Sequence, residues 1–346
     1  MFNIAQVLHL HTPYPLSDIQ CIPLDKPKEK GRLVSCGRTP DAPFHPTLPL
    51  EELVPLLQAW LQARLPEGER KPGRPRTFSD LSLFLFHLVR ALLGFSSERM
   101  RRELARNPRL RKRLGLERVP SSATLSERSR KLPWPLLRGG KRVGRGRRVL
   151  AMDATLLPAQ RSDGEAAWGV GSDGGWVYGY KLHLLVDLDT GEVLALRVTP
   201  ASWHDSPVGR GMLWGVERFP GEKPPVVVAD AAYEGEANFR LTRRRGMLLV
   251  TGHNRRRGRP KGRGRLLNLR RRGRGAYRRL LGRRWELETV FGLLKGPMGL
   301  VGAVGRVRGL KAVALQVEAW VMAWSVVAQL LGQAGLPITR VLRAVA

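Results

Sequence analysis

The sequence predicts an α/β protein in which a mixed five-stranded sheet is flanked by helices and follows an all-helical N-terminal region. Short apolar runs typical of strands are confined to residues 149–251. Before and after this stretch, apolar residues recur at the spacing of helices. The 346 residues, 42% of them hydrophobic, allow one large domain with a real core, alone or with a small second domain.

The region before the strands is expected to be helical after an irregular start. Residues 1–48 are rich in Pro and polar residues and have no clear period, so we expect them to be irregular or disordered. Residues 49–137 form the helical region, which a basic, Pro-containing linker interrupts at 69–76. Helices are expected over residues 51–65, 78–93 and 97–114, with a break at Asn107-Pro108, and from residue 120 onward.

The last of these helices carries Thr124, Arg128 and Arg130, so the region resembles a helix-turn-helix module. This pattern predicts that Arg128 and Arg130 contact DNA. A plain helical bundle with a solvated basic face would show the same spacing and is the alternative. Arg74, within Gly73-Arg74-Pro75, is a further candidate because the tripeptide is similar to a minor-groove hook.

After a Gly- and Arg-rich linker over 138–148, the pattern changes to strands alternating with helices. Strands are expected at residues 149–152, 177–188, 193–198, 226–229 and 247–251, and helices at 206–216 and 236–245. Three strands in a meander, then helix, strand, helix and strand, is the order of a ribonuclease H-like domain. We assign this domain to residues 149–335 and a C-terminal tail to residues 336–346.

A mostly apolar segment, residues 312–331, raises the question of a membrane span. The segment contains Glu318, and a carboxylate near the centre of a bilayer costs roughly 2.5–3.5 kcal/mol. We therefore expect a buried core helix and no membrane. The chain begins without a basic region followed by an apolar core, and Cys21 and Cys36 make neither a disulfide framework nor a zinc site. These features favour a cytoplasmic protein.

Two aspartates stand where strands are expected to end. Asp153 directly follows the first strand and Asp230 directly follows the fourth. If these strands are parallel neighbours, their ends meet at one edge of the sheet. Carboxylate oxygens suit Mg²⁺, and two such ions about 3.5–4 Å apart can clamp the attacking and leaving oxygens of a phosphodiester. Either aspartate alone could instead cap a strand end, but the pair predicts a metal site.

A third carboxylate is expected on a helix over residues 283–295. Arg284, Glu288 and Lys295 fall on one face of this helix. Glu286 is the rival acid, and it lies about 200° around the helix from Glu288, so only one of the two can face the aspartates. The alternative is that these charged residues form ordinary salt bridges on the helix surface, although the apolar residues of the segment indicate that the helix is packed.

Five short motifs, in order along the chain, resemble those of bacterial insertion-sequence transposases of the DDE type, in the broad group of insertion-sequence families four and five. They are Met152-Asp153-Ala154-Thr155, Tyr178 to His183, Thr199-Pro200-Ala201 with His204-Asp205-Ser206, Ala229 to Tyr233, and Arg284, Glu288, Phe291 and Lys295 of a Tyr-Arg-Glu-Lys signature. The resemblance covers residues 149–300 and selects Glu288 over Glu286. The signature departs at its Tyr, because Leu281 stands there and Tyr277 lies one helical turn earlier.

The resemblance implies a transposase that binds transposon ends, cleaves phosphodiester bonds and transfers the freed 3′-hydroxyl to target DNA. It implies that Asp153, Asp230 and Glu288 are the catalytic ligands of two Mg²⁺ ions, for which Mn²⁺ would substitute. The implied partners are double-stranded terminal repeats and target DNA, held by a homodimer. The implied DNA contacts near the metals are Arg284, Lys295 and Lys181. A nuclease or resolvase of the same fold, and an inactive DNA-binding copy, are the alternatives.

The charge of the chain points to the same partner. The formal net charge of +31 predicts a polyanionic ligand. Between Arg240 and Arg284 there is no acidic residue, and we expect a flexible loop here that tracks DNA ahead of the helix bearing Glu288. The candidate DNA contacts in this segment are Arg255, Arg256, Arg257, Arg259, Lys261 and Arg263.

Overall fold

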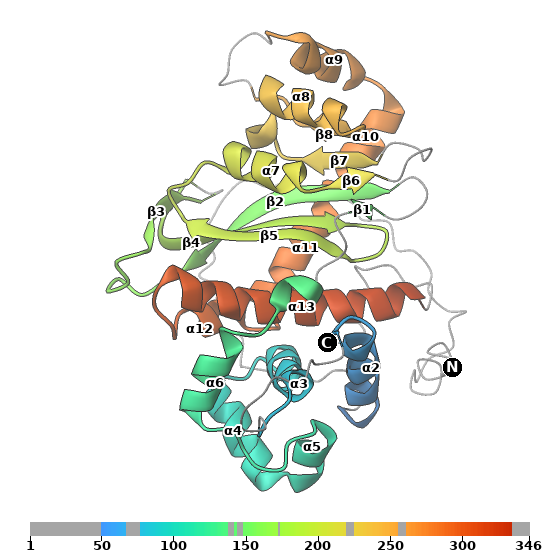
Figure 1. The fold of residues 1–346 in the computed structure, drawn as a ribbon. Coiled ribbons are helices and arrows are strands. Elements are labelled where there is room, and N and C mark those ends of the chain that lie inside the picture. Colours follow the sequence, from blue (N-terminus) through green and yellow to red (C-terminus); the bar gives the residue numbers. More distant parts are fainter. Residues whose placement is uncertain are drawn as a thin grey trace, which may run out of the picture.

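The computed structural model describes residues 50–66, 77–137, 142–143, 148–171, 174–218, 225–254 and 261–333. A sheet with helices on both faces lies on one side of the long helix α13 (Leu310–Gln333), and a group of short helices lies on the other side (Figure 1). The N-terminal residues 1–48, the tail 336–346 and the candidate DNA contacts Arg74, Arg255, Arg256, Arg257 and Arg259 lie outside the described residues. The roles expected for them stay predictions.

The N-terminal helices begin where side chains can cap them. They are α2 (Leu50–Gln62), α3 (Asp80–Leu92), α4 (Ser97–Arg106), α5 (Pro108–Arg113) and α6 (Ser122–Ser129), followed by the 3₁₀ turn η2 (Trp134–Leu137). Ser79, Ser96 and Ser121 each accept a backbone N–H in the first turn of α3, α4 and α6. Asn107 does the same for α5, so the expected break at Asn107-Pro108 is confirmed. Each cap satisfies a donor that the helix leaves unpaired.

The strand order of the sheet is the one expected from the sequence. The strands are β2 (Val149–Pro158), β3 (Ala167–Val170), β4 (Trp176–Asp187), β5 (Val193–Pro200), β7 (Val226–Ala229) and β8 (Leu248–Thr251). β5, β4, β2, β7 and β8 are neighbours in that order, antiparallel from β5 to β2 and parallel from β2 to β8. This is a ribonuclease H-like sheet. A separate parallel pair joins β1 (Arg142–Val143) to β6 (Glu217–Arg218).

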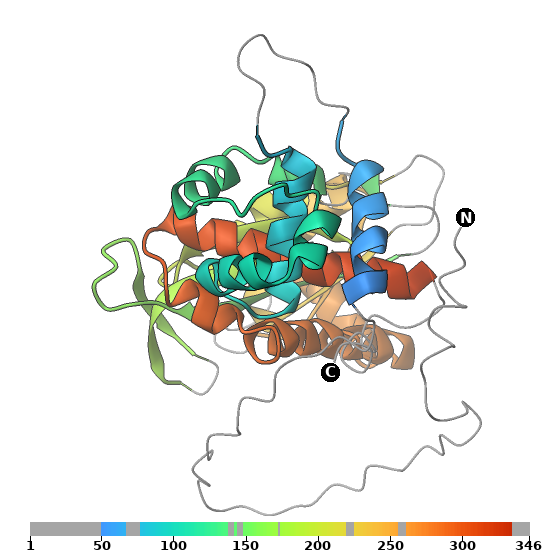
Figure 2. The same ribbon diagram turned by 90° about the horizontal axis from the view of Figure 1, so that it is seen from below.

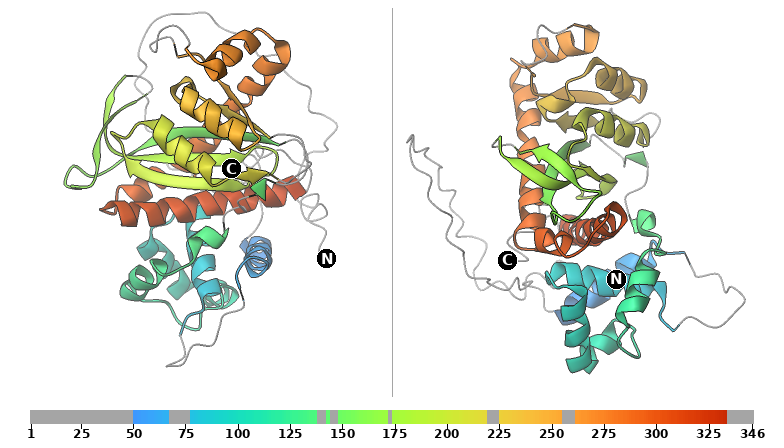
Figure 3. Two further views of the ribbon diagram at one scale, coloured as in Figure 1. Left: turned by 45° about the horizontal axis from the view of Figure 1, so that its top comes forward. Right: turned by 90° about the vertical axis from the view of Figure 1, so that its left-hand side faces the viewer.

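Helices cover both faces of the sheet. α7 (Asp205–Trp214) and α8 (Glu236–Arg244) lie on one face, and α11 (Arg284–Lys295) runs along the other (Figure 3, right). α12 (Leu300–Val304) and α13 lie on the α11 side. Ala151 of β2 belongs to the apolar core on the α11 side, whereas Leu150 and Met152 belong to the smaller core under α7 and α8. Side chains alternate along a strand, so position in β2 decides which face a polar residue reaches.

Two parts of the fold differ from the expectation. The short strand β3 pairs with the start of β4 and forms a ribbon that projects from the sheet (Figures 1 and 2). The segment expected to be a flexible loop contains two helices, α9 (Arg263–Arg271) and α10 (Gly275–Gly282). α9 forms there because the Glu236 carboxylate accepts the N–H groups of Gly264 and Arg265 in its first turn.

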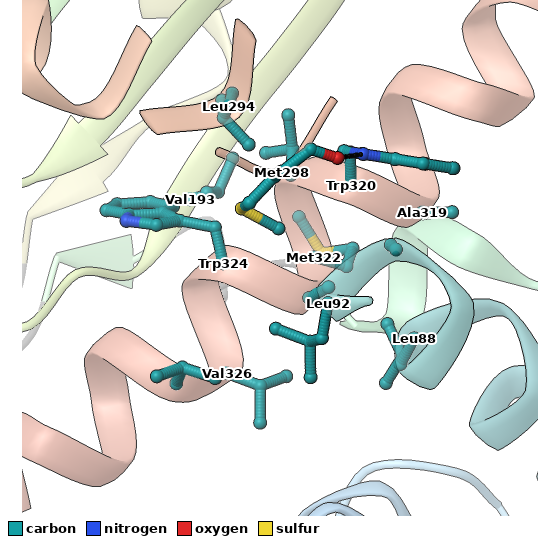
Figure 4. Close-up of a cluster of buried hydrophobic side chains, with 14 of the residues drawn as sticks. Leu88, Leu92, Val193, Leu294, Met298, Ala319, Trp320, Met322, Trp324 and Val326 are labelled. Atoms are coloured by element: carbon teal, nitrogen blue, oxygen red, sulfur yellow. Dashed lines mark hydrogen bonds between the residues drawn. The ribbon is translucent and has the colours of Figure 1, made fainter. Parts of the chain in front are cut away.

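The prediction of a core helix at the C-terminal end is confirmed by α13. Residues Leu310–Leu331 are long and apolar enough to cross a membrane, but 72% of this window is buried inside the protein. Trp320 and Trp324 are fully buried, and the indole N–H of Trp320 donates to the Met298 carbonyl at 2.6 Å. Leu88 and Leu92 of α3 approach α13 from the opposite side (Figure 4).

One apolar core runs from the N-terminal helices through α13 to the sheet. Figure 2 shows the N-terminal helices lying across α13. Arg90 of α3 is buried at this junction, where it donates to Gln316 Oε1 at 3.0 Å and lies 4.7 Å from the centre of the Trp320 ring. Burial lowers the pKa of Arg90 to about 9. The helical region is therefore packed against the sheet domain rather than tethered to it.

Candidate active site

The neighbouring strands β2 and β7 bring Asp153 and Asp230 together. The two strands pair in parallel up to Met152 and Ala229, so the aspartates are the next residues of each strand. Alternation directs both toward the α11 face. The expectation that Asp153 follows the end of its strand is wrong, because β2 continues to Pro158 beside β4. Only its pairing with β7 ends at Met152.

Each aspartate has one oxygen fixed by the backbone. Asp153 Oδ1 accepts the Ala154 N–H at 2.8 Å, and Asp230 Oδ1 accepts the Ala231 N–H at 2.6 Å. The Asp153 side chain is only 15% exposed. Burial raises the pKa of Asp153 to about 6, and the charge of Asp230 adds to the rise, while the Ala154 N–H and Arg284 oppose it. The surroundings of Asp153 therefore favour a cation close to its carboxylate.

Arg284, the first residue of α11, places its guanidinium between two carboxylates and within reach of the charge of a third. Its Nη1 lies 2.8 Å from Asp153 Oδ2, and its Nη2 lies 2.5 Å from Glu288 Oε1. Partial burial opposes the charge of Arg284, but Asp153, Glu288 and Asp230 outweigh it and raise the pKa. Asp153 of β2 and Glu288 of α11 thus share one guanidinium, and the charge of Asp230, directly after β7, also acts on it.

The remaining polar residues of α11 separate into two groups. Lys295 Nζ donates to Thr155 Oγ1 at 3.1 Å, two residues beyond Asp153 on β2. Glu286 instead accepts from Arg283, with Oε1 2.7 Å from Nε and Oε2 3.1 Å from Nη2. Arg283 also pairs with Asp189 at 2.7 Å. Glu286 is therefore engaged by Arg283, whereas Glu288 shares Arg284 with Asp153.

The donor atoms fit a hard divalent cation. In the described part of the chain, no three His, Cys, Asp or Glu side chains lie close enough to form a ready-made metal site. Arg284 lies between Asp153 and Glu288 and neutralises part of their charge. One guanidinium cannot balance three carboxylates, and oxygen ligands are those that Mg²⁺ and Mn²⁺ prefer. Rotation of the Arg284 side chain would free one oxygen of Asp153 and one of Glu288.

Lys181, expected beside the acids, lies on the opposite face of the sheet. Leu184 of β4 pairs with Asp153 and faces the α11 side, so alternation sends Lys181 toward α7. Its Nζ donates to Asp205 Oδ1 at 3.0 Å and to the Trp203 carbonyl at 2.9 Å. It lines an open hollow of about 580 Å³ at the starts of α7 and α8. The placement of Lys181 beside the catalytic acids is therefore corrected.

The other described DNA-contact candidates differ in whether their side chains are exposed or already form an ion pair within the protein. Arg128 of α6 forms an ion pair with Asp80 at the start of α3, which engages it within the helical region. Arg130, at the end of α6, is exposed. Lys261 and Arg263, next to the start of α9, are exposed as well.

Sequence reasoning missed Glu234, which is fully buried four residues after Asp230. It accepts the Asn254 N–H at 2.7 Å and lies 3.1 Å from His253 Nδ1. Arg265 of α9 approaches it at 3.7 Å. This cluster fixes α9 and the residues after β8 against the segment that follows Asp230. The only signal in the sequence was an acid close to Asp230, and its partners come from a distant segment.

The geometry agrees with the comparisons to known proteins. The sequence model of a family described as transposase DDE domain matches residues 144–326, which contain the sheet, the three acids and α11. No curated protein matches the sequence. The match to the family spans just over half of the 346 residues.

Two solved structures show likeness at low sequence identity. One is the Drosophila P element transposase strand transfer complex, with 14% identity, a TM-score of 0.27, and coverage of 53% of this chain and 43% of that chain. The other is a piggyBac transposase synaptic complex with hairpin DNA, with 12% identity, a TM-score of 0.36, and coverage of 84% and 76%. This chain thus spans less than half of the P element chain. On the strength of the family match, the chain belongs to the transposase DDE domain family.

Proposed function

We propose that this protein is a DNA transposase that cuts DNA at transposon ends and joins the freed 3′-hydroxyl to target DNA. Asp153, Asp230 and Glu288 would hold two Mg²⁺ ions, for which Mn²⁺ substitutes. The observation that supports this most is that the Arg284 guanidinium pairs with Asp153 of β2 and Glu288 of α11, while Asp230, directly after β7, is near enough for its charge to act on it. Membership of the family supports the class of reaction.

The residues of the site have separate tasks in this proposal. Asp153 and Asp230 hold the ions at the sheet, and Glu288 completes the ligand set from α11. Two divalent ions bound there would stabilise charge on the attacking and leaving oxygens of the phosphodiester. Arg284 would exchange its carboxylate partners for a DNA phosphate, which its forked guanidinium can hold through two hydrogen bonds. Lys295, beside Thr155, would hold a second phosphate.

The partner proposed is double-stranded DNA, both the terminal repeats and the target. The net charge of +31 supports a polyanionic partner. α9 and α10 contain no acidic residue and lead along the chain directly to α11, with Lys261 and Arg263 exposed at their start. DNA lying along these helices would reach the three acids. A homodimer follows from the need to hold two DNA ends, and the cytoplasm, on the nucleoid of a bacterium, is the proposed location.

The test is a transposition reaction with the full chain. A plasmid carries the genomic DNA that flanks the gene, and it is incubated with the protein and Mg²⁺ or Mn²⁺. The expected products are cuts at the ends and joined strands. Cutting without joining would indicate the nuclease or resolvase alternative. Binding without cutting would indicate the inactive copy. Absence of both binding and metal-dependent cutting would refute the proposal.

DNA affinity is expected to fall steeply with salt, because phosphate contacts release condensed counterions. For about four such contacts, raising the salt from about 50 to about 200 mM should weaken binding about a hundredfold. Fluorescence anisotropy on labelled duplex DNA measures this slope. An affinity that does not change with salt would contradict the proposal that basic residues bind the DNA phosphates.

Arg128 and Arg130 are expected to respond differently to substitution, although they are neighbours on α6. Arg128→Ala removes the ion pair with Asp80 and should lower the free energy of unfolding by about 1 kcal/mol. Arg130→Ala should leave stability unchanged and weaken DNA binding severalfold, because it removes an exposed cation. Urea unfolding and anisotropy titrations measure the two effects. If Arg130→Ala binds DNA like the wild type, α6 is not part of the DNA surface.

A further inference from the structure

The ribbon formed by β3 and the start of β4 carries an exposed aromatic face. Trp168 lies opposite Tyr178, and Val170 lies opposite Trp176, so all four side chains share one side of the ribbon. Trp168, Val170 and Trp176 are 42%, 54% and 68% exposed. The ribbon projects from the body of the protein in Figures 1 and 2 and in the left view of Figure 3. These exposed rings make this side of the ribbon an apolar surface that a ligand can reach.

The other side of the ribbon is closed by backbone packing. A Cβ at Gly169 would lie 2.6 Å from the Ala201 carbonyl oxygen, and one at Gly179 would lie 2.1 Å from that of Leu157. The glycines let the ribbon rest directly on these backbones. Tyr178 donates from its hydroxyl to the Asp163 carbonyl at 2.7 Å. The aromatic face is thus held in one orientation and is the side open to a ligand.

The charges at the base of the ribbon favour an anionic ligand. The Arg161 guanidinium lies 4.3 Å from the centre of the Trp168 ring, and exposed Arg308 donates to Gln160 at 2.8 Å. The nearby acids are already engaged: Asp163 accepts the Gly309 N–H, and Glu165 accepts the Leu310 N–H at the start of α13. Aromatic rings beside exposed arginines are the combination that binds nucleic-acid bases together with their phosphates.

The area of the patch argues against a protein partner. A tryptophan buries about 150–250 Å² when it is fully covered, so the exposed parts of Trp168 and Trp176 together offer roughly 165–275 Å². A specific protein interface needs roughly 800 Å² on each partner. The patch falls far short of that, but it matches the size of one or two bases.

The patch lies on the same face of the sheet as the catalytic acids. On β4, Trp176 and Tyr178 share their side with Leu184, which pairs with Asp153. The eight residue-to-residue steps from Trp176 to Leu184 span roughly 26 Å of strand, which corresponds to about eight base pairs of DNA. DNA that reaches Asp153 on this face can therefore also reach the ribbon.

We propose that the aromatic face of the β3–β4 ribbon binds DNA by stacking bases that have left the double helix, an inference that rests on the function proposed above. Trp176 is the main stacking platform, because the guanidinium of Arg161 already covers one side of Trp168. Arg161 and Arg308 hold the phosphates of the same strand. Paired bases are already stacked on each other, so the surface selects unpaired ones.

The test compares Trp176→Ala and Trp176→Phe with the wild type on two DNA molecules. One is a blunt duplex, and the other is the same duplex with a single-stranded extension. Trp176→Ala should weaken binding of the extended DNA about tenfold and of the blunt duplex less than about twofold. Trp176→Phe should restore most of the loss. A 2-aminopurine base in the extension should be quenched by the wild type and not by Trp176→Ala.

The matched control is Trp214→Ala, which removes a tryptophan that is 62% exposed at the end of α7, on the other side of the sheet. It should change neither affinity. Equal affinities of Trp176→Ala and wild type, or equal losses on both DNAs, would overturn the proposal. So would a change in sedimentation of Trp176→Ala without DNA, because the surface would then bind a second copy. Metal-dependent plasmid cutting by the wild type is measured separately, so failure of the proposed function is distinguishable.

Discussion

Asp153→Asn should reduce metal-dependent DNA cutting by about a thousandfold or more, while DNA binding changes by less than about twofold. The substitution keeps the shape of the side chain and its acceptor for the Ala154 N–H, but it removes the charge that would hold a divalent ion. Glu288→Gln should have a comparable effect from the side of α11. Plasmid nicking with Mg²⁺ and with Mn²⁺ measures the loss, and anisotropy measures binding.

Glu286→Gln is the matched control for Glu288→Gln. Both acids lie on α11 two residues apart, but Glu286 pairs with Arg283 and Glu288 with Arg284. Glu286→Gln should therefore keep cutting within about twofold of the wild type. Loss of cutting in Glu286→Gln with retention in Glu288→Gln would mean that the third acid has been assigned wrongly.

The same Asp153→Asn variant should be more stable than the wild type at pH 7 in the presence of a chelator, by about 2–3 kcal/mol. Burial raises the pKa of Asp153 to about 6 from an ordinary value of 3.8. The folded state therefore binds this proton more tightly than the unfolded state does. As the pH rises from about 4 to about 6, the free energy of unfolding of the wild type falls, and the loss is complete above pH 6. Asparagine carries no such penalty.

Urea unfolding at pH 4 and pH 7 measures this difference. The two proteins should be nearly equal at pH 4, where Asp153 is largely protonated in the folded state. Burial also raises the pKa of Asp187 to about 6, but that residue is present in both proteins and cancels in the comparison. Adding Mg²⁺ at pH 7 should stabilise the wild type and leave the variant unchanged. A variant that is less stable than the wild type at pH 7 with chelator would contradict the expected desolvation of Asp153.

The order of the strands and the approach of the two aspartates could be predicted from the sequence, because both depend on local patterns. Apolar runs that stop at Asp153 and Asp230 indicate two buried strands, and the order of the elements along the chain is that of a fold in which these strands are neighbours. The pattern could not show that β2 continues beyond Asp153, since that extension depends on pairing with β4. The period-two pattern of β3 was hidden, because the strand has four residues and one of them is Gly169.

Side-chain direction and distant partners were harder to predict. Leu182 and Leu184 show that Lys181 faces away from them, but which face carries α11 depends on how the helices pack. The arginine-rich segment was expected to repel itself and remain a loop. Two carboxylates from earlier in the chain supply negative charge that the segment lacks. Glu236 accepts N–H groups in the first turn of α9, and Glu234 lies beside Arg265. Those contacts join residues about thirty positions apart and leave no local pattern.

The shared core around α13 would fix the distance along the DNA between the base pairs that α6 binds and the bond that is cut. Arg90 and the apolar residues of α3 join the N-terminal helices to the same interior that supports β2. If α6 binds a terminal repeat, packed side chains hold the bound base pairs and the phosphodiester at Asp153 at a fixed separation. An extra base pair between them would rotate the scissile bond by about a tenth of a turn around the DNA axis. The interior of the protein, rather than the length of a linker, would then decide which bond is cut.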